Sequence, residues 1–374
     1  MLTKFSVKNY KQFENEIVFD LSAGNYAFSQ ECVKNGIVKT ALIYGINGTG
    51  KSNLGWAIFD MVAHLTDNES KSLPSKHYVN ANSSKNLVEF NFHFVFKHRK
   101  SSYKIEYRYS KDNNGIILSE HLFVDGNSLV NYEKGSPFTV KLEGTEHLNK
   151  HMNSSQNLSV LKYIYSNTNL DGRKKNNYLF TKFIDFVKHM LWFRNVMDGI
   201  QYVGHRLDDK SIYQSIISNS NLKDFENFLN LSGIECELDE IDSDDNKTIA
   251  FKFGKKRIKF GSIASTGTKS LAIFYYWWQQ LKINKTSLLF LDEFDSSFHF
   301  KLSSNIVKKL KELENTQVIL TTHNTHLLSN DLIRPDCGFI IDGKQIESLH
   351  KSTQKELREA HNLEKLYKAG TFDV

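Results

Sequence analysis

The sequence predicts an α/β fold built around a parallel sheet, and three observations carry this prediction. The stretch GINGTGKSN, residues 45–53, fits the pattern G-x-x-x-x-G-K-[ST] and lies between an apolar strand and a helix with apolar residues at helical spacing. A second apolar run, residues 288–291, ends in two acidic residues. After Phe260 the pattern alternates between helix and strand, which is typical of a parallel sheet.

The glycine-rich stretch favours a phosphate-binding loop. Residues 39–44 (KTALIY) predict a short buried strand before it, and a helix is expected after it. A turn of this kind aims backbone N–H groups and the positive end of the helix at an anion. We expect Lys51 to reach the β- and γ-phosphates of a nucleotide and the Ser52 hydroxyl to ligate magnesium. A chance glycine turn is the alternative, and the complete pattern in a strand–loop–helix context disfavours it.

The acidic pair after residues 288–291 predicts a Walker B element. Asp292 is expected to anchor the magnesium ion, and Glu293 to polarise the attacking water. Acidic residues at the end of a strand also cap the next helix. Next to a complete phosphate-binding loop, the Walker B interpretation is favoured.

Two weaker signals accompany these motifs. The predicted strand 317–322 (QVILTT) delivers His323, which a strand end beside the Walker B strand would bring near a γ-phosphate. The stretch STGT, residues 265–268, opens an apolar helix over residues 269–281 and is a second candidate anion site. A structural histidine and an ordinary helix cap are the respective alternatives.

The order and spacing of these motifs resemble the ABC-type ATPases. In particular, the sequence resembles the RecF/SMC/OLD branch and, within it, the bacterial AAA ATPase family fifteen. The matching stretches are FSVKNYKQF, GINGTGKSN, STGTKSL, LLFLDEFDSSFH, VILTTHN and the tail LEKLYKAGTF, which cover both ends and about half of the chain. The resemblance implies an ABC-type P-loop ATPase core with an antiparallel β lobe and a helical insertion, and no long coiled coil.

The resemblance also implies roles for individual residues. The phosphate-binding loop would consist of Gly45, Asn47, Gly48, Gly50, Lys51, Ser52 and Asn53. The signature motif would be Ser265, Gly267 and Thr268, with Asp292 and Glu293 as Walker B, Asp295 as the D-loop and His323 as the switch. Among these, Glu293, His323 and Lys51 would be catalytic, and Ser52 and Asp292 would hold magnesium. The implied cofactors are ATP and Mg²⁺.

In this family the signature of one subunit completes the ATP site of another, so the resemblance implies a homodimer or higher oligomer. Gln156 is a candidate for the Q-loop glutamine, and a surface glutamine is the alternative. Phe300 stands where the family often has proline, which puts the start of the next helix in doubt.

Four segments are expected along the chain. Residues 1–86 would form the N-terminal part of the ATPase core, and residues 236–374 its C-terminal part. Between them we expect a β-rich lobe at residues 87–150 and a helical insertion at residues 151–235.

The secondary structure is expected to follow this division. Strands are predicted near residues 3–7 and 17–21, and again from 87 to 142, where Asp125-Gly126 marks a hairpin turn. From 155 to 231 the pattern predicts helices, notably over residues 178–197 and 222–231. Strands are expected again near residues 236–241 and 248–253.

Composition places the chain among globular proteins of a reducing compartment. Hydrophobic residues make up 40% and charged residues 24%, and no run approaches the ~18 apolar residues of a membrane span. The three cysteines lie far apart without metal-ligand spacing, so a cytoplasmic location is expected. The net charge of +6 permits a nucleic-acid partner without requiring one.

Several functions fit an ATPase of this kind. A GTPase is disfavoured because no Asn-Lys-x-Asp motif occurs, and we expect neither SMC-type arms nor a Toprim nuclease domain. The sequence resembles the ATPase subunits of the bacterial antiphage systems Septu, PARIS and type I retrons. There the ATPase controls a separately encoded effector, often a nuclease. A RecF-like DNA-repair clamp and an ATP-stabilised scaffold are the alternatives. The predicted helix 178–197 is a candidate surface for the partner, and buried core is its other interpretation.

Overall fold

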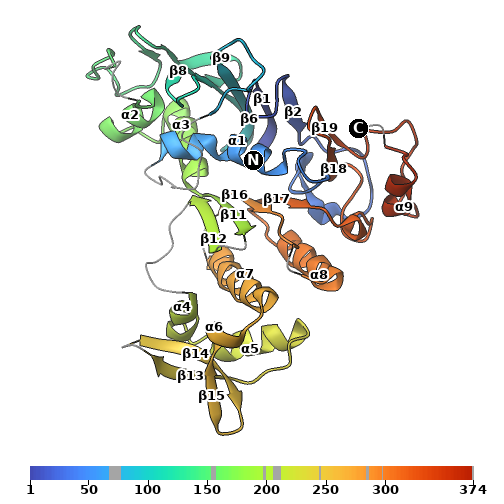
Figure 1. Cartoon of the computed structure of the whole chain (residues 1–374). Coiled ribbons are helices and arrows are strands. Elements are labelled where there is room, and N and C mark those ends of the chain that lie inside the picture. The colour runs from blue at the N-terminus through green and yellow to red at the C-terminus, as the bar shows by residue number, and fades with distance from the viewer. Residues whose placement is uncertain are drawn as a thin grey trace. The chain divides into compact units, whose positions relative to one another are not determined.

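The computed structural model describes residues 1–66, 77–152, 157–196, 199–204, 212–243, 246–283, 286–296 and 298–372. The chain divides into two compact units, whose elements are labelled in Figure 1. The first combines Met1–His205, Thr286–Phe294 and Val307–Val374, and the second combines Arg206–Lys285 and Asp295–Ile306. The division into four segments stays a prediction.

Groups of strands and groups of helices follow one another along the chain. The helices are α1 (Lys51–Leu65), α2 (Val160–Asn167), α3 (Lys175–Lys188), α4 (Ile212–Ser218), α5 (Leu222–Leu231), α6 (Phe260–Ile263), α7 (Thr266–Ile283), α8 (Phe300–Lys311) and α9 (Leu363–Lys368), with 3₁₀ turns η1 (Gln30–Cys32) and η2 (Thr325–Leu327). The strands up to the insertion are β1 (Leu2–Lys8), β2 (Ile17–Asp20), β3 (Val33–Lys34), β4 (Ile37–Val38), β5 (Thr40–Tyr44), β6 (Val88–His98), β7 (Ser101–Lys111), β8 (Ile117–Val124), β9 (Asn127–Glu133) and β10 (Thr139–Val140). The later strands are β11 (Met190–Val196), β12 (Gly199–Gly204), β13 (Leu238–Ser243), β14 (Asn246–Phe253), β15 (Lys256–Lys259), β16 (Leu288–Asp292), β17 (Gln317–Thr322), β18 (Gly338–Ile341) and β19 (Ile346–Ser348).

The core sheet of the first unit has the strand order β12-β11-β16-β17-β5-β18-β19. Strands β11, β16, β17, β5 and β18 pair in parallel, and β12 and β19 pair antiparallel at the two edges. Every residue of β5, β16 and β17 is buried, which explains why these strands are continuous apolar runs. The carboxyl ends of β16, β17 and β5 therefore lie side by side.

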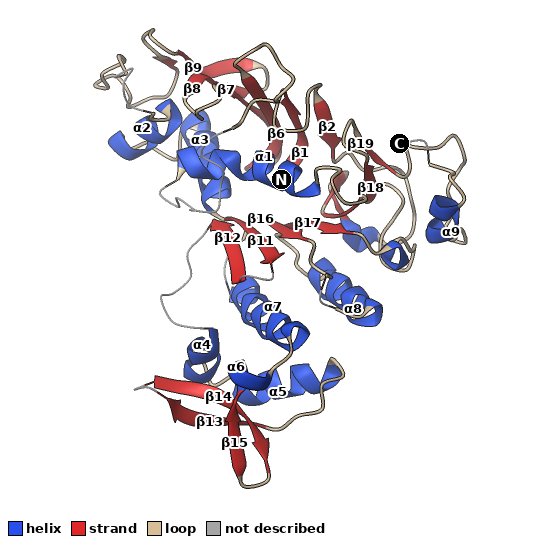
Figure 2. Cartoon of the chain, in the orientation of Figure 1, coloured by secondary structure: helices blue, strands red, loops and turns tan. Residues whose placement is uncertain are grey.

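A second sheet in this unit is antiparallel, with the order β10-β9-β8-β7-β6-β1-β2. The predicted strands of the β lobe are thus present, and the opening strands join the same sheet. Asp125 and Gly126 form a two-residue turn between β8 and β9 with φ of 46° and 80°. Both values are left-handed, which the type I′ hairpin turn requires. Helix α3 lies against β6 and contacts α1 (Figure 2).

The expected helix over residues 178–197 is wrong in its second half. Helix α3 ends at Lys188, and β11 pairs in parallel with β16, so that Met190 lies opposite Leu288. An apolar run such as MLWF fits a buried helix and a buried strand equally, and only its pairing partner decides between them. Strand β12 likewise lies where a helix was expected.

The same segment does not provide the expected partner surface. Helix α3 buries its apolar side chains within the first unit, and Leu179, Phe183 and Ile184 have no exposed surface. The buried-core interpretation is therefore the correct one for this helix.

The second unit packs helices α4–α7 on a small sheet, β13-β14-β15 (Figure 2). Its core includes Phe225, Ile249, Phe251, Phe260 and Tyr275. Strand β15 is exposed at all four residues, and it pairs antiparallel with β14 in a hairpin. The predicted fold class is confirmed as an α/β fold with a mainly parallel core sheet, an antiparallel sheet and further helices. Where the chain is described, its longest helix has 18 residues, and no long coiled coil is present.

None of the described helices is both long and apolar enough to span a membrane.

A buried polar network ties helix α1 to the antiparallel sheet. The Asp60 carboxylate, 3% exposed, accepts hydrogen bonds from Tyr78 (2.7 Å), Tyr109 (2.8 Å) and the Lys111 ammonium (2.7 Å). Burial alone would raise the pKa of Asp60, but the Lys111 charge holds it below its usual value. The buried ion pair between Asp60 and Lys111 is therefore supported by two further hydrogen bonds, from Tyr78 and Tyr109.

The network continues through His64 to Glu120. His64 Nδ1 lies 3.1 Å from the Asp60 carbonyl and must donate to it, while His64 Nε2 lies 2.7 Å from the Tyr107 hydroxyl. That hydroxyl also lies 2.7 Å from Glu120 Oε1, so its single proton faces two acceptors. Burial lowers the pKa of His64 to about 3 and raises that of Glu120. Of these two groups, Glu120 therefore keeps a proton to higher pH than His64 does.

We expect this proton to make stability depend on pH. The folded protein retains the Glu120 proton above the ordinary carboxyl pKa of 4.5, whereas the unfolded chain loses it. The contribution is complete below that pKa and falls by about 1.4 kcal/mol per pH unit above it, until the folded pKa is passed. In urea melts from pH 5 to 8, the stability of wild type relative to Glu120→Gln should therefore decline as the pH rises. A constant difference between the two proteins would contradict the assignment.

Candidate functional site

The phosphate-binding loop connects β5 to α1 and depends on two glycines. A Cβ on Gly45 would lie 2.6 Å from Thr49 Oγ1 and 2.7 Å from the Ile341 carbonyl oxygen, so no side chain fits there. Gly50 has φ of 95°, and a Cβ on it would lie 2.6 Å from Gln12 Nε2. Both glycines of the motif are thus required by the shape of the loop.

Lys51, the first residue of α1, turns its ammonium group back to the loop. Its Nζ donates to the carbonyls of Gly45 (2.8 Å) and Ile46 (3.0 Å), and the residue is only 4% exposed. Burial lowers the pKa of Lys51, and the negative charges of Glu293 and Asp292 oppose this shift.

Gln12 holds the loop from outside, and sequence reasoning did not assign it a role. Its side chain donates to the Gly48 carbonyl (3.1 Å) and accepts from Asn53 Nδ2 (2.6 Å). The residue lies in the opening stretch FSVKNYKQF, where the resemblance gave the only signal. Of the other predicted loop residues, Asn47 is exposed and Ser52 lies partly exposed in the first turn of α1.

The two acidic residues of the Walker B element are oriented by Thr321 of β17. Asp292 ends β16 with 1% exposure, and its Oδ1 accepts from the Thr321 hydroxyl at 2.7 Å. The same hydroxyl oxygen accepts from the backbone N–H of Glu293 at 2.8 Å. Glu293 has φ of 49°, a left-handed conformation that is unusual for a side-chain-bearing residue. Thr321 was also missed, and its only sequence signal is its position two residues before His323.

His323 lies between the lysine and the glutamate. Its Nδ1 is 3.3 Å from Lys51 Nζ, and its Nε2 is 3.6 Å from Glu293 Oε1. Glu293 and His323 directly follow β16 and β17, and Lys51 begins α1 after the loop that follows β5. These three strands are neighbours in the sheet. Ligands of open parallel sheets bind at such an edge. The structure thus brings together Lys51, Glu293 and His323, with Asp292 held beside Glu293.

The other predicted residues belong to the second unit. Ser265 precedes α7, and its Oγ accepts from the Thr268 N–H at 3.2 Å, as a helix cap does. The hydroxyls of Ser265 and Thr268 are 2.8 Å apart, and Gly267 lies in the first turn of the helix. Asp295 begins the shorter stretch of this unit. Gln156, the candidate for the Q-loop, lies outside the described residues.

The residues of the first unit fit a magnesium nucleotide. The glycine cradle at Gly45 and Gly50 has no room for side chains, and Lys51 offers a cation at the start of a 15-residue helix. Ser52 and the buried Asp292 are oxygen donors of the kind that Mg²⁺ prefers. In the described part of the chain, no three His, Cys, Asp or Glu side chains could hold a metal ion. Magnesium here would therefore depend on phosphate oxygens as well.

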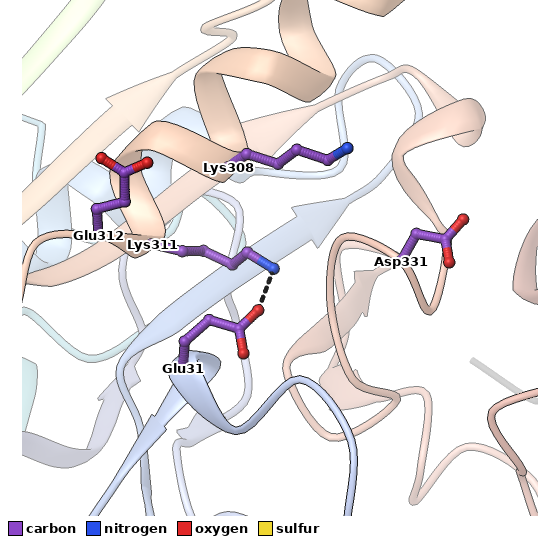
Figure 3. Close-up of a pocket in the computed structure, with 5 residues that line it drawn as sticks. All are labelled: Glu31, Lys308, Lys311, Glu312 and Asp331. Atoms are coloured by element: carbon purple, nitrogen blue, oxygen red, sulfur yellow. Dashed lines mark hydrogen bonds and ion pairs between the residues drawn. The ribbon is translucent and has the colours of Figure 1, made fainter.

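A separate pocket of about 370 Å³ in the first unit contains none of these residues. It is lined by Glu31, Lys308, Lys311, Glu312 and Asp331 (Figure 3). Lys311 Nζ contacts Glu31 Oε1 at 2.6 Å across it, as the dashed line in Figure 3 marks. It is distinct from the candidate nucleotide site.

Comparison with protein families identifies one matching model. The family described as "AAA domain, putative AbiEii toxin, Type IV TA system" matches residues 41–329. This range covers the phosphate-binding loop, the Walker B element and His323. No curated protein is similar at a significant level.

Among solved structures, SMC heads are similar at low identity. The SmcHead bound to the C-winged helix domain of ScpA is 16% identical, with 94% of this chain and 98% of that chain covered and a TM-score of 0.47. The SMC head domain from Thermotoga maritima is 17% identical, with 93% of this chain and 98% of that chain covered and a TM-score of 0.42. The Smc head domain with an extended coiled coil, bound to the C-terminal domain of ScpA derived from Pyrococcus furiosus, is 13% identical. In this comparison 94% of this chain and 97% of that chain are covered, and the TM-score is 0.45.

Proposed function

The chain belongs to this AAA domain family, and from that premise we propose that it is an ATP-hydrolysing ABC-type ATPase. The observation that supports this most is the arrangement of Lys51, His323 and Glu293, with contacts of 3.3 and 3.6 Å, at the carboxyl edge of the core sheet. Nucleotide binding alone does not require a carboxylate at the position of Glu293, whereas hydrolysis requires a group that accepts a proton from water.

Each residue has a distinct chemical task in this proposal. Lys51 offsets the charge of the β- and γ-phosphates, and Ser52 and Asp292 hold Mg²⁺. Glu293 accepts a proton from the attacking water, and Thr321 fixes the backbone from which Glu293 projects. His323, which contacts both Lys51 and Glu293, would lie beside the γ-phosphate and couple its position to that of Glu293. Bound ATP supplies the phosphoanhydride bond that is broken.

The proposal includes a second copy of the chain. The N-terminus of α7, with Ser265, Gly267 and Thr268, offers backbone N–H groups and hydroxyls to an anion. We infer that it faces the γ-phosphate held by another copy, with Asp295 beside it, so that two copies in a head-to-tail arrangement complete each ATP site.

The proposed biological role is that of a sensor or regulatory subunit in antiphage defence. The family description names a toxin of a type IV toxin–antitoxin system, which supports a role in controlling a harmful activity. In our proposal this activity resides in a separately encoded effector such as a nuclease. Closure of two ATP-bound copies would provide the two states that the effector distinguishes.

Phage challenge of cells that express the gene with and without its genomic neighbours tests this role. We expect protection to require both a neighbouring gene and Lys51. Protection by this chain alone, with no partner recovered on purification, would refute the two-component arrangement. Duplex DNA affinity that falls steeply with salt, without protection, would instead favour the repair clamp.

A further inference from the structure

Helix α9, near the end of the chain, holds the loop that carries His323. Glu364 Oε1 accepts from the Thr325 hydroxyl at 2.9 Å and lies 3.2 Å from His326 Nδ1. Lys368, one turn later, donates to the same oxygen at 2.6 Å and keeps the pKa of Glu364 below its usual value. Glu364 is therefore ionised, and one of its oxygens accepts two hydrogen bonds and lies at ion-pair distance from His326.

The same helix reaches the strand that leads into the phosphate-binding loop. The Tyr367 ring packs edge-on against Tyr44, with 4.7 Å between ring centroids. Tyr44 is the last residue of β5 and directly precedes Gly45. Helix α9 thus contacts two segments: the loop that follows His323, and the end of β5, which leads into the loop before Lys51.

The contact between Glu364 and Thr325 lies on a polar side of the loop. It borders a cavity of about 310 Å³ whose lining is mainly polar and includes His326, Asn330, Glu359 and Glu364. Leu327 and Leu328 of the same loop are buried, with 0% and 1% exposure, so apolar packing holds that side of the loop, and the hydrogen bond to Glu364 holds the Thr325 side.

From these contacts we propose that Glu364 is a positioning residue for ATP hydrolysis, acting through Thr325 on His323. This inference rests on the proposed ATPase function. Thr325 is two residues beyond His323, and the short segment between β17 and η2 transmits a displacement of one to the other. Displacements of about 1 Å in a catalytic group lower rates by up to about 100-fold.

Steady-state hydrolysis by Glu364 variants tests the proposal. We expect Glu364→Ala to lower kcat about 10-fold with KM for ATP unchanged, because the loss of one charged hydrogen bond is worth about this factor. Glu364→Gln retains an acceptor for the Thr325 hydroxyl and should restore most of the rate. Lys365→Ala, an exposed residue on the same helix, serves as the matched control and should behave as wild type. A Glu364→Ala enzyme with wild-type kcat would overturn the proposal.

A double-mutant cycle separates positioning from general destabilisation. Thr325→Val removes the hydroxyl that donates to Glu364. If Glu364 acts through this hydroxyl, kcat of the double variant Thr325→Val/Glu364→Ala should be no lower than kcat of the slower single variant. Additive losses would show that Glu364 does not act through Thr325.

Hydrogen exchange provides a readout that does not need activity. Without nucleotide, amides of residues 323–328 should exchange faster in Glu364→Ala than in Lys365→Ala. Should wild type fail to hydrolyse ATP, the proposed function is wrong. The exchange rates alone then decide whether Glu364 holds the loop. Equal exchange in Glu364→Ala and Lys365→Ala would show that it does not.

Discussion

We expect Lys51→Ala to abolish ATP binding and hydrolysis. The substitution removes the buried cation that would contact two phosphates, and each charged hydrogen bond is worth about 1.5–3 kcal/mol. ATP affinity should therefore fall at least about 100-fold. Titration calorimetry with Mg²⁺-ATP measures the change.

Lys308→Ala is the matched control for Lys51→Ala. Lys308 is an exposed lysine in the first unit that lines the separate pocket of Figure 3. Because Lys51 also donates to two loop carbonyls, melting temperatures of all three proteins must be compared. A folded Lys51→Ala protein with wild-type ATP affinity would contradict the site.

The second expected result is that Glu293→Gln binds ATP but scarcely hydrolyses it. The amide preserves the size of the side chain and the backbone contact with Thr321, but it cannot accept a proton from water. Loss of a general base lowers rates by about 100- to 10,000-fold. Phosphate release, measured beside titration calorimetry, separates the two effects.

Glu312→Gln is the control for this substitution, since Glu312 belongs to the separate pocket. Its phosphate release should equal that of wild type. Wild-type turnover by Glu293→Gln would remove this residue from the catalytic machinery.

Local sequence patterns predicted the parts of the site that depend on neighbouring residues. The Lys51 loop requires a strand, a glycine turn and a helix in succession, and all three are visible within residues 39–65. Asp292 and His323 follow short, largely apolar runs in a part of the chain where helix and strand patterns alternate, which favours buried parallel strands. Because parallel strands end at a common edge, their proximity could be anticipated.

Contacts between distant segments could not be predicted in this way. Gln12 touches Gly48, and Glu364 touches Thr325, across stretches whose pairing no local pattern records. The first unit itself is assembled from three separate stretches of the chain.

The error over residues 178–197 has a related cause. Residues 189–193 (HMLWF) contain no glycine or proline to mark the end of α3, and their apolar character suits either a helix or a strand. Strand β11 forms because β16, almost a hundred residues later, offers it a parallel partner.

The central claim is that two copies of the chain together complete each ATP site. Sedimentation velocity of Glu293→Gln with Mg²⁺-ATP tests it most directly, because this variant should retain bound ATP. We predict an ATP-dependent dimer that disappears with ADP and after the further substitution Gly267→Asp, which places a carboxylate at the start of α7. A protein that binds ATP with the same oligomeric state in all three conditions would contradict the claim.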